Sequence, residues 1–212
     1  EGVRPDPRIY REAAKELLGH GEYQSAAKIL LLLRAAEPDA ATRRQLYLQA
    51  IRILQSGNLL ALALDTAERE LGELSGDTEV LYYLVTLARA ANRPDAAARF
   101  ARAMLKLSLQ LQWRRTLLAQ SGFDARPWRV ATNGVPDLPF DDRIYTLGFE
   151  AFLGNRQLDD AQRVAASAVR QAPDSLVWRE RLATSSEWAG KPQEGLEQWL
   201  VIARRTGRED AW

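Results

Sequence analysis

Side chains that carry acid–base, nucleophilic or metal chemistry are scarce in this sequence. His20 is the only histidine, and cysteine is absent. A single histidine without cysteine cannot complete a Ser–His–Asp triad, a Cys–His pair or one of the common zinc sites. Because His20 lies between Gly19 and Gly21, we expect it to be a solvated turn residue. The sequence therefore predicts no catalytic residue, no metal site and no cofactor.

Two carboxylate pairs, Asp141-Asp142 and Asp159-Asp160, are the remaining candidates for catalysis. A glycosidase needs two carboxylates that flank one glycosidic bond across a cleft. Each pair, however, stands at the start of an expected helix, where carboxylates accept hydrogen bonds from unpaired N–H groups and oppose the positive helix end. Helix capping is therefore the favoured interpretation, and we expect a protein that is not an enzyme. A helical-repeat polysaccharide lyase or hydrolase is the alternative from another class.

The overall composition is that of a packed domain with balanced charge. Hydrophobic residues make up 46%, and 29 basic against 28 acidic side chains give a formal net charge of +1. No block of like charge stands out, which argues against nucleic acid or an anionic membrane surface as a partner. The longest aliphatic run, residues 29–33, is far shorter than the roughly 20 residues of a membrane-spanning helix. The sequence opens on Glu1 without a signal-like stretch, so we expect a processed or excised segment of a longer protein.

Residues 7–38 follow an order of residue types that is repeated later in the chain. An aromatic and a small residue share one helical face, a glycine ends that helix, a second face of small and bulky residues follows, and a proline closes the segment. These positions are Tyr10, Ala14, Leu17, Gly21, Ala26, Leu30, Leu33 and Pro38. The same order returns with Tyr145, Gly148, Phe152, Ala161, Ala165, Ala168 and Pro173. The interval between the two closing prolines is close to four units of about 34 residues.

The apolar periodicity and the turn residues predict ten helices. Their expected ranges are 7–19, 22–36, 41–56, 59–74, 78–91, 94–120, 142–154, 158–171, 175–189 and 192–206. The sixth is either one long helix or two helices joined near Ser108. Small residues, among them Ala161 and Gly195, should allow paired helices to approach closely. A further repeat is expected to begin near Trp212.

These repeats resemble the tetratricopeptide (TPR) family, whose members are interaction scaffolds. The resemblance covers nearly the whole chain outside residues 121–141. It implies an all-α fold, a right-handed superhelical solenoid of helix–turn–helix repeats with one long irregular loop. The expected organisation is a single solenoid over 1–212, with 121–141 as an irregular insertion within it.

The insertion at 121–141 contains three prolines and an Asn-Gly pair, which rule out regular helix. Its aromatic residues are too apolar for a free linker. Three interpretations remain open. The aromatic side chains fold back and fill the groove or a defective repeat, the loop presents Arg126 and Trp128 to a partner, or the segment is disordered.

The expected first helices of the repeats are rich in arginine, namely Arg8, Arg11, Arg44, Arg52, Arg143 and Arg179. In a helical-repeat array these helices line the concave surface, so the arginines are candidate partner-binding residues, together with Lys15 and Tyr47. An ordinary solvated helix face is the open alternative, and the alternating signs of Arg11-Glu12 and Lys15-Glu16 favour it. Tetratricopeptide proteins that bind chaperone tails use a Lys/Asn clamp. Here Arg11 and Lys15 stand at the matching positions, so the Asn is missing.

A narrower resemblance rests on residues 163–212, RVAASAVRQAPDSLVWRERLATSSEWAGKPQEGLEQWLVIARRTGREDAW. This string is similar to the periplasmic repeats of Pel exopolysaccharide export proteins (PelB-type), in which a long repeat array precedes an outer-membrane β-barrel. The resemblance implies a periplasmic scaffold that recruits a polysaccharide-modifying deacetylase or hydrolase and helps guide polymer to the outer-membrane pore. The parent protein would then be membrane-anchored or fused to the barrel. The alternative within the scaffold class is a cytosolic adaptor or co-chaperone that binds peptide segments in its concave groove.

Overall fold

The computed structural model describes residues 6–120 and 141–207, with only the backbone over 108–120. In this part of the chain it contains ten α-helices, one 3₁₀-helix and no strand, which confirms the all-α class. The elements are α1 Pro7–Gly19, α2 Tyr23–Ala36, α3 Ala40–Ser56, α4 Leu60–Glu70, η1 Gly72–Gly76, α5 Thr78–Ala90, α6 Pro94–Gln120, α7 Asp142–Gly154, α8 Leu158–Gln171, α9 Leu176–Trp188 and α10 Pro192–Thr206. The chain divides into two compact units, Glu1–Arg93 (unit 1) and Pro94–Trp212 (unit 2). That the two form a single solenoid stays a prediction.

The predicted helices agree with the observed ones to within a few residues, with one exception. The helix expected over 59–74 ends at Glu70, and the 3₁₀-helix η1 follows it. Gly72 has a φ of 45°, which takes the backbone out of the right-handed helical region and stops α4 early. The sixth helix is continuous over Pro94–Gln120 and is not divided near Ser108. No helix in the described residues is long and apolar enough to cross a bilayer.

The odd-numbered helices α1, α3, α5, α7 and α9 all end in the same turn. In each turn one residue has a positive φ between 54° and 75°, and these residues are Gly21, Asn58, Asn92, Arg156 and Gly190. The N–H of the following residue donates to the carbonyl oxygen five positions earlier over 2.8–3.0 Å. The N–H of the left-handed residue donates to the carbonyl three positions earlier. This pair of hydrogen bonds is the Schellman motif, so the repeat is present in the backbone as well as in the residue types.

The same five helices begin with a side-chain cap. The capping residues are Asp6, Asp39, Asp77, Asp141 and Ser175, and each accepts a hydrogen bond from a backbone N–H of the first turn. A cap of this kind stabilises a helix by about 1 kcal/mol. The even-numbered helices α2, α4, α8 and α10 have no side-chain cap bond, because the preceding turn feeds the chain directly into them. The capping role predicted for Asp141 is confirmed.

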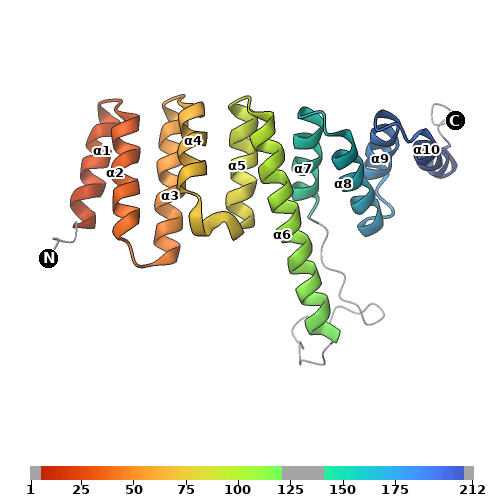
Figure 1. The fold of residues 1–212 in the computed structure, drawn as a ribbon, viewed down its shortest axis with the longest axis horizontal. Helices are drawn as coiled ribbons and strands as arrows, with labels where there is room; N and C mark the ends of the chain where they lie inside the picture. The colour runs from red at the N-terminus through yellow and green to blue at the C-terminus, as the bar shows by residue number, and fades with distance from the viewer. Residues whose placement is uncertain (1–5, 121–140, 208–212) are drawn as a thin grey trace. The chain divides into compact units, whose positions relative to one another are not determined.

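In unit 1 the helices pack on one another in chain order from α1 to α5 (Figure 1). Small residues belong to the core of this unit, and Ala26 and Ala63 are fully buried. A Cβ on Gly57 would lie 2.6 Å from Cγ of Tyr23, so the end of α3 needs glycine to fit against the start of α2. Close packing of this kind fixes the orientation of each helix against its neighbour. It therefore determines which faces of α1 and α3 line a surface groove.

Unit 2 likewise joins its helices in chain order, from α6 to α10. Trp178 of α9 is 1% exposed, and its ring meets Tyr145 and Phe149 of α7 edge-on at centroid distances of 6.3 and 6.0 Å. Its Nε1–H donates to the carboxylate of Asp142 over 2.6 Å, and the Arg181 guanidinium lies 4.5 Å from the ring centroid. Edge-on aromatic pairs add about 0.5–1.5 kcal/mol beyond the area they bury. Trp178 therefore links α7 and α9.

Candidate partner-binding groove

A groove between α1 and α3 of unit 1 brings together three of the predicted partner-binding residues, Arg11, Lys15 and Arg52. Its volume is about 670 Å³. It is lined by Arg11, Ala14, Lys15 and Leu18 of α1, by Leu30 of α2, and by Thr42, Gln45, Leu46, Gln49, Arg52, Ile53 and Ser56 of α3. Among these lining residues three carry a positive charge, and none is Asp or Glu. The groove is therefore cationic although the chain as a whole is nearly neutral.

The groove has an apolar floor beneath a polar rim. Ala14, Leu30 and Leu46 are 3%, 5% and 2% exposed, so their side chains belong to the core of unit 1. Gln45 and Gln49 of α3 are exposed along the rim. An amide side chain both donates and accepts hydrogen bonds, which is what pairing with the backbone of a bound peptide requires.

Lys15 keeps its charge available to a ligand. Its Nζ lies 4.0 Å from the Glu12 carboxylate, and both side chains are at least three-quarters exposed. An exposed ion pair of this length contributes little, because water screens it and two flexible side chains must be ordered. The Glu12 contact therefore does not tie up the Lys15 ammonium.

Arg52 continues the cationic lining toward α5. Its guanidinium lies 5.8 Å from the centroid of the Tyr83 ring, and the Tyr83 hydroxyl donates to Gln55 Oε1 over 2.7 Å. Burial raises the pKa of the Tyr83 hydroxyl, which outweighs the opposing effect of the positive charge on Arg52. Tyr83 thus stays a neutral hydrogen-bond donor that supports the C-terminal half of α3.

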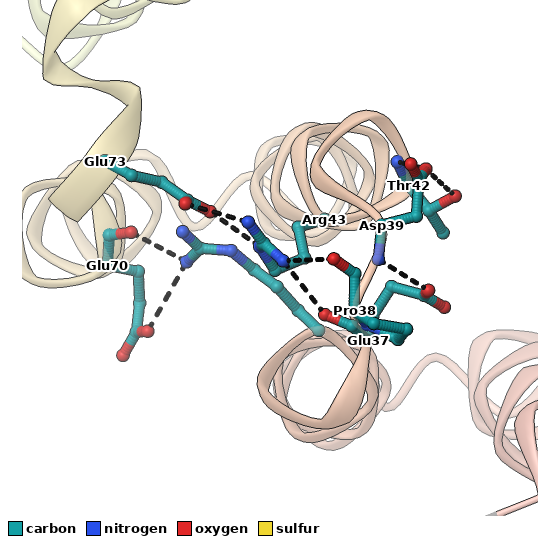
Figure 2. Close-up of polar contacts among 8 residues, drawn as sticks. Glu37, Pro38, Asp39, Thr42, Arg43, Glu70 and Glu73 are labelled. Atoms are coloured by element: carbon teal, nitrogen blue, oxygen red, sulfur yellow. Dashed lines mark hydrogen bonds and ion pairs between the residues drawn. The ribbon is translucent and has the colours of Figure 1, made fainter.

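An ion-paired cluster around Arg43 holds the N-terminal half of α3. Arg43 Nε and Nη2 donate to the Glu73 carboxylate over 2.7 and 2.9 Å, and Nη1 donates to the carbonyl oxygens of Pro38 and Glu37 over 2.7 and 3.2 Å (Figure 2). The bidentate bond from Arg43 lowers the pKa of Glu73 despite some desolvation. Arg43 therefore joins the α2–α3 turn to η1 and fixes where α3 begins.

Two predicted partner-binding residues on α3, Arg44 and Tyr47, are engaged within unit 1. Arg44 Nε donates to Asp77 Oδ2 over 2.5 Å. Tyr47 is 0% exposed, its hydroxyl donates to the Ala67 carbonyl over 2.9 Å, and burial raises its pKa. The Arg34 guanidinium lies 5.1 Å from its ring centroid. Tyr47 is consequently a core residue with no surface to offer a partner.

The predicted binding residues in unit 2 also have contacts of their own. Arg143 Nη2 lies 3.2 Å from the Asp141 carboxylate. Arg179 Nε donates to the Pro173 carbonyl over 3.0 Å, and its Nη1 donates to Gln198 Oε1 over 2.8 Å. These contacts position the arginines at the starts of α7 and α9.

Arg8 lies at the start of α1, where its backbone N–H donates to the Asp6 cap over 2.9 Å. It is exposed but is not part of the groove lining. Arg126 and Trp128, and with them the three interpretations of the insertion, fall outside the described residues. Their proposed roles stay predictions.

The polar rim on α3 was not predicted as part of the site, although the sequence carries a signal for it. Thr42, Gln45, Gln49, Arg52 and Ser56 are spaced three or four residues apart, which places them on one helical face. Arg52 is the one charged residue in this stripe and was therefore predicted, whereas the uncharged Gln45 and Gln49 were not.

Of the two carboxylate pairs only Asp141 accepts a cap bond; the capping predicted for Asp159 and Asp160 is wrong, because α8 has no side-chain cap bond and the two carboxylates lie in its first turn. Asp159 lies 3.6 Å from Lys191, and Asp160 accepts a hydrogen bond from Arg102 over 2.7 Å. His20 is exposed at the end of α1, with Nδ1 2.9 Å from the Glu16 carbonyl oxygen, as predicted for a turn residue. Within the described residues no three His, Cys, Asp or Glu side chains are close enough to hold a metal ion.

Comparison with known proteins gives a likeness of fold alone. No family model matches the chain, and no curated protein does. Among solved structures it is similar to YrrB, described as a TPR protein with an unusual peptide-binding site, with a TM-score of 0.52, 16% identity and coverage of 97% of this chain and 89% of YrrB. It is also similar to MamA, with a TM-score of 0.50, 12% identity and coverage of 97% and 94% of the two chains.

Proposed function

The chain has a tetratricopeptide-type helical-repeat fold, and we propose that it is a non-catalytic scaffold whose groove between α1 and α3 holds an extended acidic segment of a partner protein. The observation that carries the proposal is the charge of the groove, with Arg11, Lys15 and Arg52 and no acidic residue among the described lining. That the fold neighbour YrrB is described as having a peptide-binding site supports a peptide as the class of ligand.

The dimensions and chemistry of the groove suit an extended peptide. Its cations come from two helices, so one strand of peptide can meet Arg11 and Lys15 on one side and Arg52 on the other. Complementary charge raises the rate of association and excludes basic sequences. Gln45 and Gln49 are placed to bond the peptide backbone, and the floor around Leu46 can accept an apolar side chain.

Fluorescence anisotropy with labelled peptides tests this proposal on the whole chain. The probes are a peptide of alternating Glu and Ala and its counterpart with Lys in place of Glu. We expect the acidic peptide to bind and the basic one not to bind. The combined variant Arg11→Ala, Lys15→Ala and Arg52→Ala should weaken binding by about tenfold or more, which corresponds to about 1.4 kcal/mol.

Lys28→Ala is the matched control, because it removes an exposed positive charge from α2 of the same unit outside the groove. It should bind the acidic peptide like the wild type. Equal loss of affinity in Lys28→Ala and in the single variant Arg52→Ala, each of which removes one positive charge, would show that only net charge matters, and the groove proposal would then be abandoned.

We further propose that the scaffold serves a bacterial exopolysaccharide export system in the periplasm. There it would recruit a polysaccharide-modifying deacetylase or hydrolase and help guide polymer to an outer-membrane pore. The support is the resemblance of residues 163–212 to Pel-type export repeats, and the peptide groove offers a place for a segment of the recruited enzyme. An acidic surface segment on that enzyme is what the groove would require.

A pull-down of the cognate periplasmic deacetylase by this chain, together with fractionation of the cells that make the protein, tests the assignment. Binding at micromolar concentration, reduced by the groove variant, is the expected result. Recovery of the protein in the cytosol, or no binding of the deacetylase, would favour the cytosolic adaptor instead.

A further inference from the structure

Trp188, the last residue of α9, is exposed at a position where the fold does not call for an aromatic side chain. The equivalent residue, two positions before the left-handed turn residue, is Gly19, Ser56, Ala90 and Gly154 in the other odd-numbered helices. All five positions are exposed, and Trp188 is 55% exposed. Because four small residues form the same turn, the indole is not needed to build it.

The exposure of Trp188 is unusual for its size and type. The other large hydrophobic side chains that are more than half exposed in the described residues are aliphatic, namely Ile9, Leu32, Val177 and Leu196. An exposed tryptophan presents a large rigid apolar surface with a polar N–H at its edge, a combination concentrated at binding sites.

Trp188 forms one wall of a hollow within unit 2. The hollow has a volume of about 430 Å³ and is lined by Arg156, Gln157, Leu158, Asp159, Asp160, Trp188 and Ala189. It therefore joins the end of α9 to the turn between α7 and α8. Its volume falls in the range of about 300–1,000 Å³ that small-molecule sites occupy.

The two carboxylates of the hollow already have internal partners. Asp160 accepts a hydrogen bond from Arg102 over 2.7 Å, and Arg163 lies 3.6 Å from it. Asp159 lies 3.6 Å from Lys191 and is 68% exposed. A basic ligand would have to compete with these cations, whereas an acidic ligand would face two carboxylates. An uncharged ligand that both donates and accepts hydrogen bonds meets neither penalty.

We propose that this hollow binds an uncharged pyranose unit of a saccharide, stacked on the Trp188 indole. The C–H face of a pyranose ring is apolar and flat enough to cover an indole, while its hydroxyls point outward around the ring. Those hydroxyls can donate to the Asp159 carboxylate and accept from the Arg156 guanidinium and from the Gln157 Nε2 group, whose neighbouring Oε1 already accepts a hydrogen bond from Arg102 over 3.2 Å. The site lies in unit 2 and does not depend on the peptide groove of unit 1.

Indole ¹H–¹⁵N spectra of the whole chain test the proposal, with cellotriose and tri-N-acetylchitotriose as probes. The Trp188 signal is assigned by its loss in Trp188→Ala. We expect it to shift in a saturable way with a Kd of about 1 mM or below, which corresponds to about −4 kcal/mol. Trp188→Ala should weaken binding at least tenfold in calorimetry, while Val177→Ala, an exposed apolar residue elsewhere on α9, should bind the sugar like the wild type.

Two results would overturn the saccharide site. One is the absence of a saturable shift at Trp188 with either sugar. The other is a shift produced by hexalysine and by neither sugar, which would assign the hollow to a basic peptide. Trp188→Ala should leave binding of the acidic peptide unchanged, so failure here and failure of the groove proposal are separate outcomes.

Discussion

Arg156 and Gly190 hold the same position in the two turns of unit 2 that end α7 and α9, with φ angles of 55° and 74°. In each turn the next N–H donates to the carbonyl five positions earlier, over 2.9 and 2.8 Å. A side chain in the left-handed region costs about 1–2 kcal/mol, whereas glycine adopts it freely. Arg156 is therefore held there by the hydrogen bonds of the turn and by the helices that the turn joins.

Gly190→Ala should lower the free energy of unfolding by about 1 kcal/mol, because alanine disfavours the positive φ of this turn. Gly154→Ala is the matched control. Neither glycine has a heavy atom within 4 Å of the place where a Cβ would stand, and only Gly190 has a positive φ. Gly154 ends α7, so alanine there should be neutral or stabilising by up to about 1 kcal/mol. Urea denaturation compares the two, and equal effects would contradict the conformational argument.

Gly195→Ala should destabilise unit 2 more than Gly148→Ala does. A Cβ on Gly195 would lie 2.9 Å from the Ala183 carbonyl oxygen, part of the α9 backbone, which cannot move without separating α9 from α10. A Cβ on Gly148 would lie 2.8 Å from Cδ1 of Leu105, the flexible end of a side chain. Overpacking of a rigid contact costs about 1–3 kcal/mol. Thermal unfolding monitored by circular dichroism should give a lower melting temperature for Gly195→Ala than for Gly148→Ala. The reverse order would contradict the close contact between Gly195 and the α9 backbone.

Ser186→Ala should stabilise the protein, whereas Ser185→Ala should destabilise it. Both serines are 0% exposed on α9. The Ser185 hydroxyl donates to the Arg181 carbonyl over 2.6 Å, but the Ser186 Oγ has no hydrogen-bond partner among the described residues. Removing a buried unsatisfied hydroxyl relieves a desolvation cost of about 1–3 kcal/mol, whereas removing a bonded one loses about 1 kcal/mol. Chemical denaturation of the two variants is the measurement, and a loss of stability in Ser186→Ala would indicate a partner for that hydroxyl.

The helices and their small contact residues could be predicted because both are encoded locally. Apolar spacing, capping residues and single glycines at turns define where a helix begins and ends. The predicted C-terminal end of α4 was wrong, and this error has a local cause as well. Gly72 looks like an isolated glycine in a helical pattern, and only its positive φ of 45° shows that the helix has already stopped.

The candidate site could be predicted only in part, because it depends on register between helices. Tyr47 looks like a surface residue beside Arg44, yet it stands as far before its left-handed turn residue as Tyr145 stands before its own, and Tyr145 is only 2% exposed. Counting from the turns would have assigned it correctly. Counting back from the turns also shows that Trp188 occupies a position where the other odd-numbered helices have small residues.

The ion pair between Arg44 and Asp77 should make the stability of unit 1 depend on acidity. Burial alone would raise the Asp77 pKa, but hydrogen bonds from Arg44 and from the backbone N–H groups of Val80 and Glu79 outweigh it, so the pKa lies below its ordinary 3.8. A carboxyl whose pKa is lower in the folded state stabilises the fold at neutral pH. That contribution is lost as the pH falls from about 4 through the folded pKa.

Asp77→Asn, which keeps a capping side chain but removes the charge, should therefore be less stable than the wild type at neutral pH. The gap should narrow as the pH falls from about 4 through the folded pKa, because the wild-type carboxyl then becomes protonated as well. Asp65→Asn removes the same charge from a 59% exposed side chain of unit 1 and controls for net charge. Urea denaturation across this pH range measures the gap. A difference between wild type and Asp77→Asn that stays constant with pH would mean that the charge of Asp77 does not contribute to folding, and that its capping bonds account for its role.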